Sequence, residues 1–149
     1  MQEITPQAHE LLERTNRQFS ECNALYHTVA QRCGLSDAAF WLLYALCTAD
    51  EPLTQNRIAA DWALPKQTLN SAVAAMVKKG LVELFPGKGA HSGKLVTLTD
   101  EGRALAARTV EPVILAEQRA IVGMEAEMQQ FYEIGQRHME RLRAKFEKL

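Results

Sequence analysis

Residues 54–102 follow an order of local signals that very few folds can accommodate. A short segment with helical periodicity leads through a tight turn to a second helical segment that Gly80 ends. Two short β-type runs, 81–85 and 94–98, come next, and a loop rich in glycine and lysine separates them. This order predicts a winged helix-turn-helix, in which the second helix fits the major groove of B-DNA and the hairpin reaches the flanking backbone or minor groove.

The second helix of this motif has two chemically different faces. We expect Pro65 at its first helical position. Its apolar side chains recur at the spacing i, i+4, i+7 and i+8 of a buried stripe, namely Leu69, Val73, Met76 and Val77. The opposite face carries side chains suited to base edges and phosphates, namely Lys66, Gln67, Thr68, Asn70 and Ser71. We therefore expect this face to read DNA.

Charge is distributed unevenly along the chain. The net formal charge is only −1, which argues against a protein that coats nucleic acid nonspecifically. Residues 54–94 nevertheless carry six basic and two acidic side chains, whereas residues 1–53 carry three basic and seven acidic ones. The positive charge is thus concentrated in the predicted motif, as contacts with phosphates require.

Long helices are predicted on both sides of the motif. Thr5 can cap a first helix that ends at Gly34, and Ser36 can cap a second one, residues 37–49, whose apolar surface on all sides predicts burial. Thr99 can cap the helical C-terminal part, which bends around Gly123. The predicted fold class is therefore mainly α, with a small β-hairpin wing.

The apolar faces of these flanking helices exceed what one winged-helix unit can cover. Residues 101–149 alone contain a long series of apolar side chains at helical spacing. Two-fold dimers that read two half-sites are the common solution for helix-turn-helix proteins, so we expect a homodimer on a palindromic operator of double-stranded DNA. The alternative to a dimer is that the flanking helices pack against one another within a single monomer.

Composition excludes several other classes of protein. The chain has 149 residues, 47% hydrophobic and 23% charged, which suits one globular domain, and no apolar run approaches the length that spans a bilayer. Met1-Gln2-Glu3 lacks the basic start of a signal peptide, so we expect a cytoplasmic protein. The three cysteines suggest neither a disulfide framework nor a CxxC metal site, and the four histidines are far apart. Motifs of hydrolases and nucleotide-binding enzymes are absent from the sequence, so we expect no catalysis, metal or cofactor.

Three stretches together resemble the MarR family of transcriptional regulators, and the likeness covers nearly the whole chain. They are GLSDAAFWLLYAL, LTQNRIAADWALPKQTLNSAVAAMVKKGLV and VTLTDEGRAL. The resemblance implies a single MarR-like domain, 1–149, with a winged DNA-binding lobe over 36–100 and dimerisation helices over 1–34 and 101–149. It also implies a repressor that leaves DNA when a small, commonly aromatic or phenolic, ligand or an oxidant acts.

The resemblance also assigns residues to the DNA contact. Its recognition-helix positions coincide with the polar face described above, and Thr54, Gln55 and Arg57 would lie near the DNA backbone. Many family members carry an Asp-x-Arg pair in the wing, but those positions are Ala90 and Ser92 here. A basic residue often found in the recognition helix is replaced by Ser71. We expect the remaining basic side chains of the wing to substitute, namely Lys88, His91 and Lys94.

The signal-sensing part has two candidates, each with a simpler interpretation. Four aromatic side chains are placed to line a pocket for an aromatic ligand where the dimer helices meet the DNA lobe, namely Tyr26, Trp41, Tyr44 and Trp62. The simpler interpretation is that they belong to the core. Cys22 resembles the peroxide-sensing thiol of some family members, although no basic side chain lies one helical turn away to activate it. Its simpler interpretation is a small buried apolar residue.

A second function remains open from the sequence. A winged-helix module that has lost DNA binding and acts as an antirepressor or adaptor would account for the missing wing Asp and Arg. The two functions differ in one property, because a DNA binder loses affinity steeply as salt rises, whereas an adaptor has no specific duplex affinity.

Overall fold

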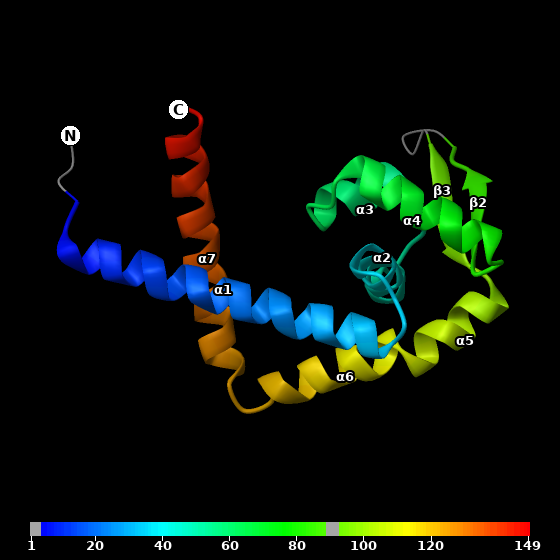
Figure 1. The fold of residues 1–149 in the computed structure, drawn as a ribbon, viewed down its shortest axis with the longest axis horizontal. Coiled ribbons are helices and arrows are strands. Elements are labelled where there is room, and N and C mark those ends of the chain that lie inside the picture. Colours follow the sequence, from blue (N-terminus) through cyan, green and yellow to red (C-terminus); the bar gives the residue numbers. More distant parts are fainter. Residues whose placement is uncertain (1–3, 89–92) are drawn as a thin grey trace. The chain divides into compact units, whose positions relative to one another are not determined.

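The computed structural model describes residues 4–88 and 93–149, and it shows a helical protein with one small sheet (Figure 1). The elements are α1 (Pro6–Arg32), α2 (Asp37–Thr48), β1 (Leu53–Thr54), α3 (Gln55–Asp61), α4 (Lys66–Lys78), β2 (Val82–Pro86), β3 (Lys94–Leu98), α5 (Asp100–Arg108), α6 (Val110–Ile121) and α7 (Glu125–Phe146). The predicted fold class is confirmed. Contacts divide the chain into two compact units between Glu111 and Pro112.

Helix α2 forms the centre of the first unit. It packs against α1, α4 and α5, and Phe40, Leu42 and Leu43 are completely buried. Ser36 caps it by accepting a hydrogen bond from the amide of Ala39 at 3.2 Å, as the sequence predicts. The prediction of burial on every side is only partly confirmed, because Trp41 and several residues of the same helix are half-buried.

A tight turn with one left-handed residue joins the two helices of the motif. Thr54 caps α3 by accepting a hydrogen bond from the amide of Arg57 at 3.2 Å. Ala63 then adopts a left-handed conformation with φ of 49°, and the amide of Leu64 donates back to the carbonyl of Ala59. Pro65 precedes α4 as its N-cap residue, one position earlier than predicted.

The predicted buried stripe of α4 is correct at three of its four positions. Leu69, Val73 and Met76 are buried in the first unit, where α4 packs against α2. Val77 was expected in the same stripe, but its side chain is 39% exposed. Val77 follows Met76 by 100° around the helix, which places it at the edge of the contact with α2.

The sheet has the antiparallel order β1-β3-β2. The hairpin of β2 and β3 pairs Val82 with Leu98 and ends with Pro86 opposite Lys94. The strands predicted over 81–85 and 94–98 are thus confirmed, with β2 shifted by one residue. Strand β1 has only two residues and gave no strand signal in the sequence, because its pairing with β3 is a long-range contact.

A compact junction joins the end of α4, both strands of the hairpin and the start of α5. The amide of Thr99 donates to the carbonyl of Leu81 at 3.1 Å, and its hydroxyl donates to the carbonyl of Gly80 at 2.6 Å. The same hydroxyl accepts the amide of Gly102 at 3.0 Å and so caps α5. A Cβ at position 102 would lie 1.9 Å from the Leu81 carbonyl oxygen, so this approach requires glycine.

The second unit contains α6 from Pro112 onward and α7. Gly123, with φ of +86°, ends α6 where the sequence predicts a bend. The backbone amides of Glu125 and Gly123 donate to the Glu125 carboxylate and lower its pKa, which suits an acid in the first turn of α7. No helix within residues 4–88 and 93–149 combines the length and the apolar character needed to cross a membrane.

Replacing Gly102 by alanine should destabilise the protein by about 1–3 kcal/mol, because the added methyl group overlaps the Leu81 carbonyl. Ala60→Ser in α3 is the matched control, since it also adds one atom but at an exposed helical position, and it should change stability by less than about 0.5 kcal/mol. Urea unfolding followed by circular dichroism measures both. Equal stability of Gly102→Ala and wild type would contradict the close approach at the junction.

Candidate nucleic-acid interface

The N-terminal half of α4 presents the side chains that the sequence assigns to base reading. Lys66, Gln67, Thr68 and Asn70 are all exposed, whereas Leu69 between them is completely buried. Lys66 takes part in none of the salt bridges among the described residues. The helix therefore projects one cation and three hydrogen-bonding groups from a single exposed surface, as contacts with base edges require.

The side-chain hydroxyl groups of two other residues predicted to contact DNA form hydrogen bonds within the protein. The hydroxyl of Ser71 donates to the carbonyl of Gln67 at 3.0 Å, one turn earlier in α4. The hydroxyl of Thr54 accepts the amide of Arg57 as the cap of α3. Both side chains retain the capacity for one further bond, but each is held in place by its own helix.

Arg57 lies on the exposed side of α3 and is paired within the same helix. Its Nε donates to Oδ2 of Asp61 at 2.5 Å. This hydrogen bond, together with the charge of Asp61, raises the pKa of the Arg57 guanidinium, and the more distant charge of Glu51 acts in the same direction. The side chain predicted to approach the DNA backbone is therefore held by a local carboxylate, a contact that the sequence analysis missed although the spacing i, i+4 is visible in it.

The wing places its two described cations at the ends of its loop. The amide of Gly87 donates to the carbonyl of Gly93 at 2.7 Å, which closes the base of the loop. Lys88 and Lys94 flank this closure and both are exposed. The predicted contact His91 and the substituted positions Ala90 and Ser92 lie outside the described residues.

The four aromatic side chains proposed for a ligand pocket form one continuous cluster. Trp41 contacts Tyr26, Tyr44 and Trp62, with ring centroids 4.9, 5.3 and 5.5 Å apart. The rings of Trp41 and Trp62 are stacked with an interplanar angle of 29°, and Phe40 joins from the buried side. All four predicted rings are half-buried, so they combine the expected core role with partial exposure.

The cysteines lie in three different environments. Cys22 is exposed on α1, which contradicts its interpretation as a buried apolar residue within this chain. Cys33 follows α1, and its thiol donates to the carbonyl of Thr109 at 3.9 Å. Burial raises the pKa of the Cys47 thiol, and the charge of Glu111 adds to the effect, so Cys47 is a poor nucleophile at neutral pH.

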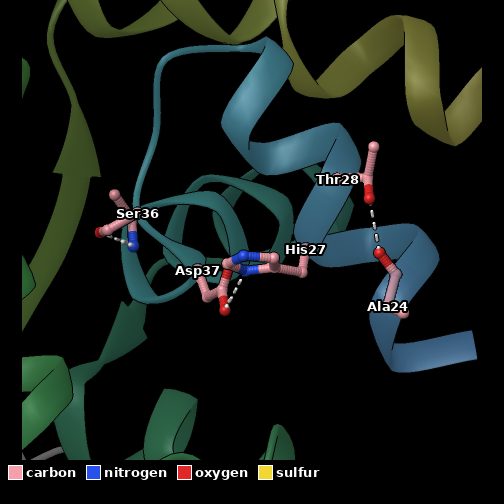
Figure 2. Close-up of polar contacts among 6 residues, drawn as sticks. Ala24, His27, Thr28, Ser36 and Asp37 are labelled. Carbon is pink, nitrogen blue, oxygen red and sulfur yellow. Dashed lines mark hydrogen bonds and ion pairs between the residues drawn. The ribbon is translucent and has the colours of Figure 1, made fainter. Parts of the chain in front are cut away.

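A polar contact between α1 and α2 was not anticipated from the sequence. Figure 2 shows His27 of α1 facing Asp37 at the start of α2, and Nδ1 of His27 lies 2.9 Å from both carboxylate oxygens. Both side chains are about half exposed. Among the residues that the structure describes, no three metal-ligating side chains gather around this pair or elsewhere. The contact joins the two helices that also carry Tyr26 and Trp41 of the aromatic cluster.

Two helices joined by a tight turn and followed by a hairpin define this chain as a winged helix-turn-helix protein. A model of the MarR family matches residues 34–89, which include both helices of the motif. The resemblance inferred from the sequence is confirmed, and the chain has the structure of a MarR-family transcriptional regulator.

Solved structures of the same family are similar over nearly the whole chain. A MarR family regulator from Neisseria meningitidis is 25% identical, with a TM-score of 0.74 over 97% of this chain and 100% of the other. A MarR/EmrR family regulator from Acinetobacter is 17% identical, with a TM-score of 0.67 over 98% and 100%. Staphylococcus aureus MarR, solved with salicylate and kanamycin, is 16% identical, with a TM-score of 0.66 over 92% and 93%. No curated protein matches this sequence.

The stacked indoles allow a direct test of the aromatic cluster. Replacing Trp41 and Trp62 by leucine, singly and together, should show a coupling energy of about 0.5–1.5 kcal/mol in urea unfolding, because each ring loses its partner. The control cycle combines Trp41 with Phe85 of the wing, for which the described ring contacts show none, and its coupling should stay below about 0.5 kcal/mol. Equal coupling in the two cycles would refute the stacking.

Proposed function

We propose that this chain is a dimeric, sequence-specific regulator of transcription that binds double-stranded DNA in the cytoplasm and represses until a small ligand or an oxidant acts. The observation that carries the proposal is the exposed polar surface of Lys66, Gln67, Thr68 and Asn70 on α4. A helix presented after a tight turn, with these groups in its first two turns, has the chemistry of a recognition helix.

The charge of the motif supports this function. Lys66, Lys88 and Lys94 are exposed and, within the described part of the chain, make no salt bridge. Free cations on the recognition helix and at the wing suit phosphates on both sides of a major groove. We assign base reading to α4 with Ser71, and backbone contacts to Thr54, Gln55, Arg57 and the wing, including His91.

The proposed dimer rests on apolar surface that the described contacts do not cover. From the N-cap residue of α7 onward, apolar or small residues recur every three or four positions, at Met124, Met128, Phe131, Gly135, Met139, Leu142 and Phe146. No residue of α7 is buried, and Phe131 is 57% exposed. Leu11, Leu12, Phe19 and Leu25 are likewise exposed on α1. Members of the family dimerise, and a second copy would bury these side chains, with 1–34 and 101–149 as the dimerisation segments of one domain.

The proposed signal is a small molecule, and Staphylococcus aureus MarR is known in complex with two small molecules, salicylate and kanamycin. The cluster of Tyr26, Trp41, Tyr44 and Trp62 offers partly exposed aromatic surface in the same unit as the DNA-reading helix. The exposed thiol of Cys22 is the proposed point of attack for an oxidant.

Selection of duplexes from a random pool, with the full-length protein at ~150 mM salt, tests the function. An enriched inverted repeat with half-site centres about one helical turn apart is the expected result. Absence of enrichment by a folded, dimeric protein would overturn the proposal and favour the adaptor alternative, which the substitutions at Ala90 and Ser92 of the wing keep open.

Two variants separate base reading from phosphate contact. Asn70→Ala should weaken operator binding by about 1–3 kcal/mol and leave nonspecific binding unchanged, because it removes an amide that pairs with a base edge. Lys88→Ala should weaken binding to all sequences and reduce the salt slope by about one. Fluorescence anisotropy with operator and scrambled duplexes over a salt series measures both. Wild-type behaviour of both variants would show that the reading surface is wrongly assigned.

The dimer is tested on α7. Phe131→Asp should convert the dimer into monomer at micromolar concentration, because it places a charge in the apolar stripe. Arg137→Asp on the other side of the same helix introduces the same side chain and should remain dimeric. Sedimentation equilibrium gives the mass of each. A dimeric Phe131→Asp protein would remove α7 from the proposed interface.

A further inference from the structure

A hollow of about 650 Å³ opens in the first unit, between the end of α2 and the end of α3. The loop that joins α2 to β1 completes its rim. Its volume lies within the range of sites for small ligands. Neither the base-reading face of α4 nor the wing contributes a residue to it.

The hollow is rich in acidic residues. The carboxylates of Asp50, Glu51 and Asp61 line it. Within the described part of the chain, Asp50 and Glu51 make no salt bridge, and the cation that approaches the group is Arg57, which binds Asp61. The last residues of α2 and α3 also line the hollow, so the negative ends of two helix dipoles add to the field.

Apolar and aromatic residues also line the hollow. Ala45, Leu53 and Trp62 line it. The indole of Trp62 is held by stacking on Trp41 and by an edge contact with Tyr44, so its orientation is set before any ligand arrives. A fixed indole beside carboxylates is the combination that recognises organic cations, through cation–π attraction and ion pairing.

We propose that this hollow binds an organic cation, an amine or quaternary ammonium with an apolar or aromatic body, and that this is the chemical class of the effector. The inference rests on the proposed function and specifies its ligand. The same three carboxylates repel an anionic aromatic such as salicylate, so the charge of the hollow selects for the opposite sign of ligand.

Asp61 connects the hollow with the proposed DNA contact. It lines the hollow and also holds Arg57 on the exposed side of α3. A cation bound beside Asp61 competes with Arg57 for the same carboxylate. Because the pair with Asp61 holds Arg57 in place on α3, this competition removes the fixed position of Arg57 for its backbone contact. Occupancy of the hollow therefore lowers duplex affinity, and the linkage is reciprocal.

Calorimetric titration of the full-length protein with benzyltrimethylammonium chloride, without DNA, tests the site. We expect saturable binding, and at least a tenfold loss of affinity in the double variant Asp50→Asn/Glu51→Gln. Both residues are exposed, so the variant should fold as wild type does. Glu83→Gln in the exposed part of β2 removes one negative charge away from the hollow and should bind as wild type does.

The outcomes are distinct from those of the duplex selection. Absence of saturable binding, or equal affinity of the double variant and wild type, overturns the cation site even where an operator is found. Tighter binding of salicylate than of the ammonium overturns the assigned charge of the ligand. Binding that depends on Asp50 and Glu51 supports the site even where no operator is enriched, and in that case only the DNA-binding function fails.

Discussion

The junction at Thr99 is the constraint on which the geometry of the motif depends. One residue bonds to the carbonyls of Gly80 and Leu81 and caps α5 through the amide of Gly102. Because Gly80 follows α4 and Leu81 precedes β2, these bonds orient α4, the wing and α5 relative to one another. The placement of the exposed polar side chains of α4, which we propose to read bases, therefore depends on these backbone contacts.

The sequence predicted what is decided locally. The bounds of β3, the capping by Ser36 and Thr54, and the break at Gly123 all follow from caps, alternation or a glycine with positive φ. These signals lie within a few residues of the structure they specify, so one sequence is enough to find them. The same holds for the exposed polar face of α4, because the helical spacing of the buried residues Leu69, Val73 and Met76 predicts which side chains lie opposite them.

What the sequence left open depends on contacts between distant segments. Strand β1 forms because Leu53 pairs with Val96, and no pattern in the neighbouring sequence predicts this strand. Val77 is exposed because the contact with α2 covers only part of the apolar stripe of α4. The hollow brings together Asp50, in the loop after α2, and Asp61, the last residue of α3, and the sequence shows each of them only as a residue near a helix end.

The stacking of Trp41 on Trp62 has a consequence for observing this protein. The chain contains only these two tryptophans, and one of them lines the hollow while the other stacks against it. All of the indole emission of the molecule therefore originates at one place, beside the carboxylates of the hollow. Because indole emission depends on its surroundings, we expect a ligand in the hollow to change the intrinsic tryptophan fluorescence of the protein, so that its binding can be followed without an attached dye.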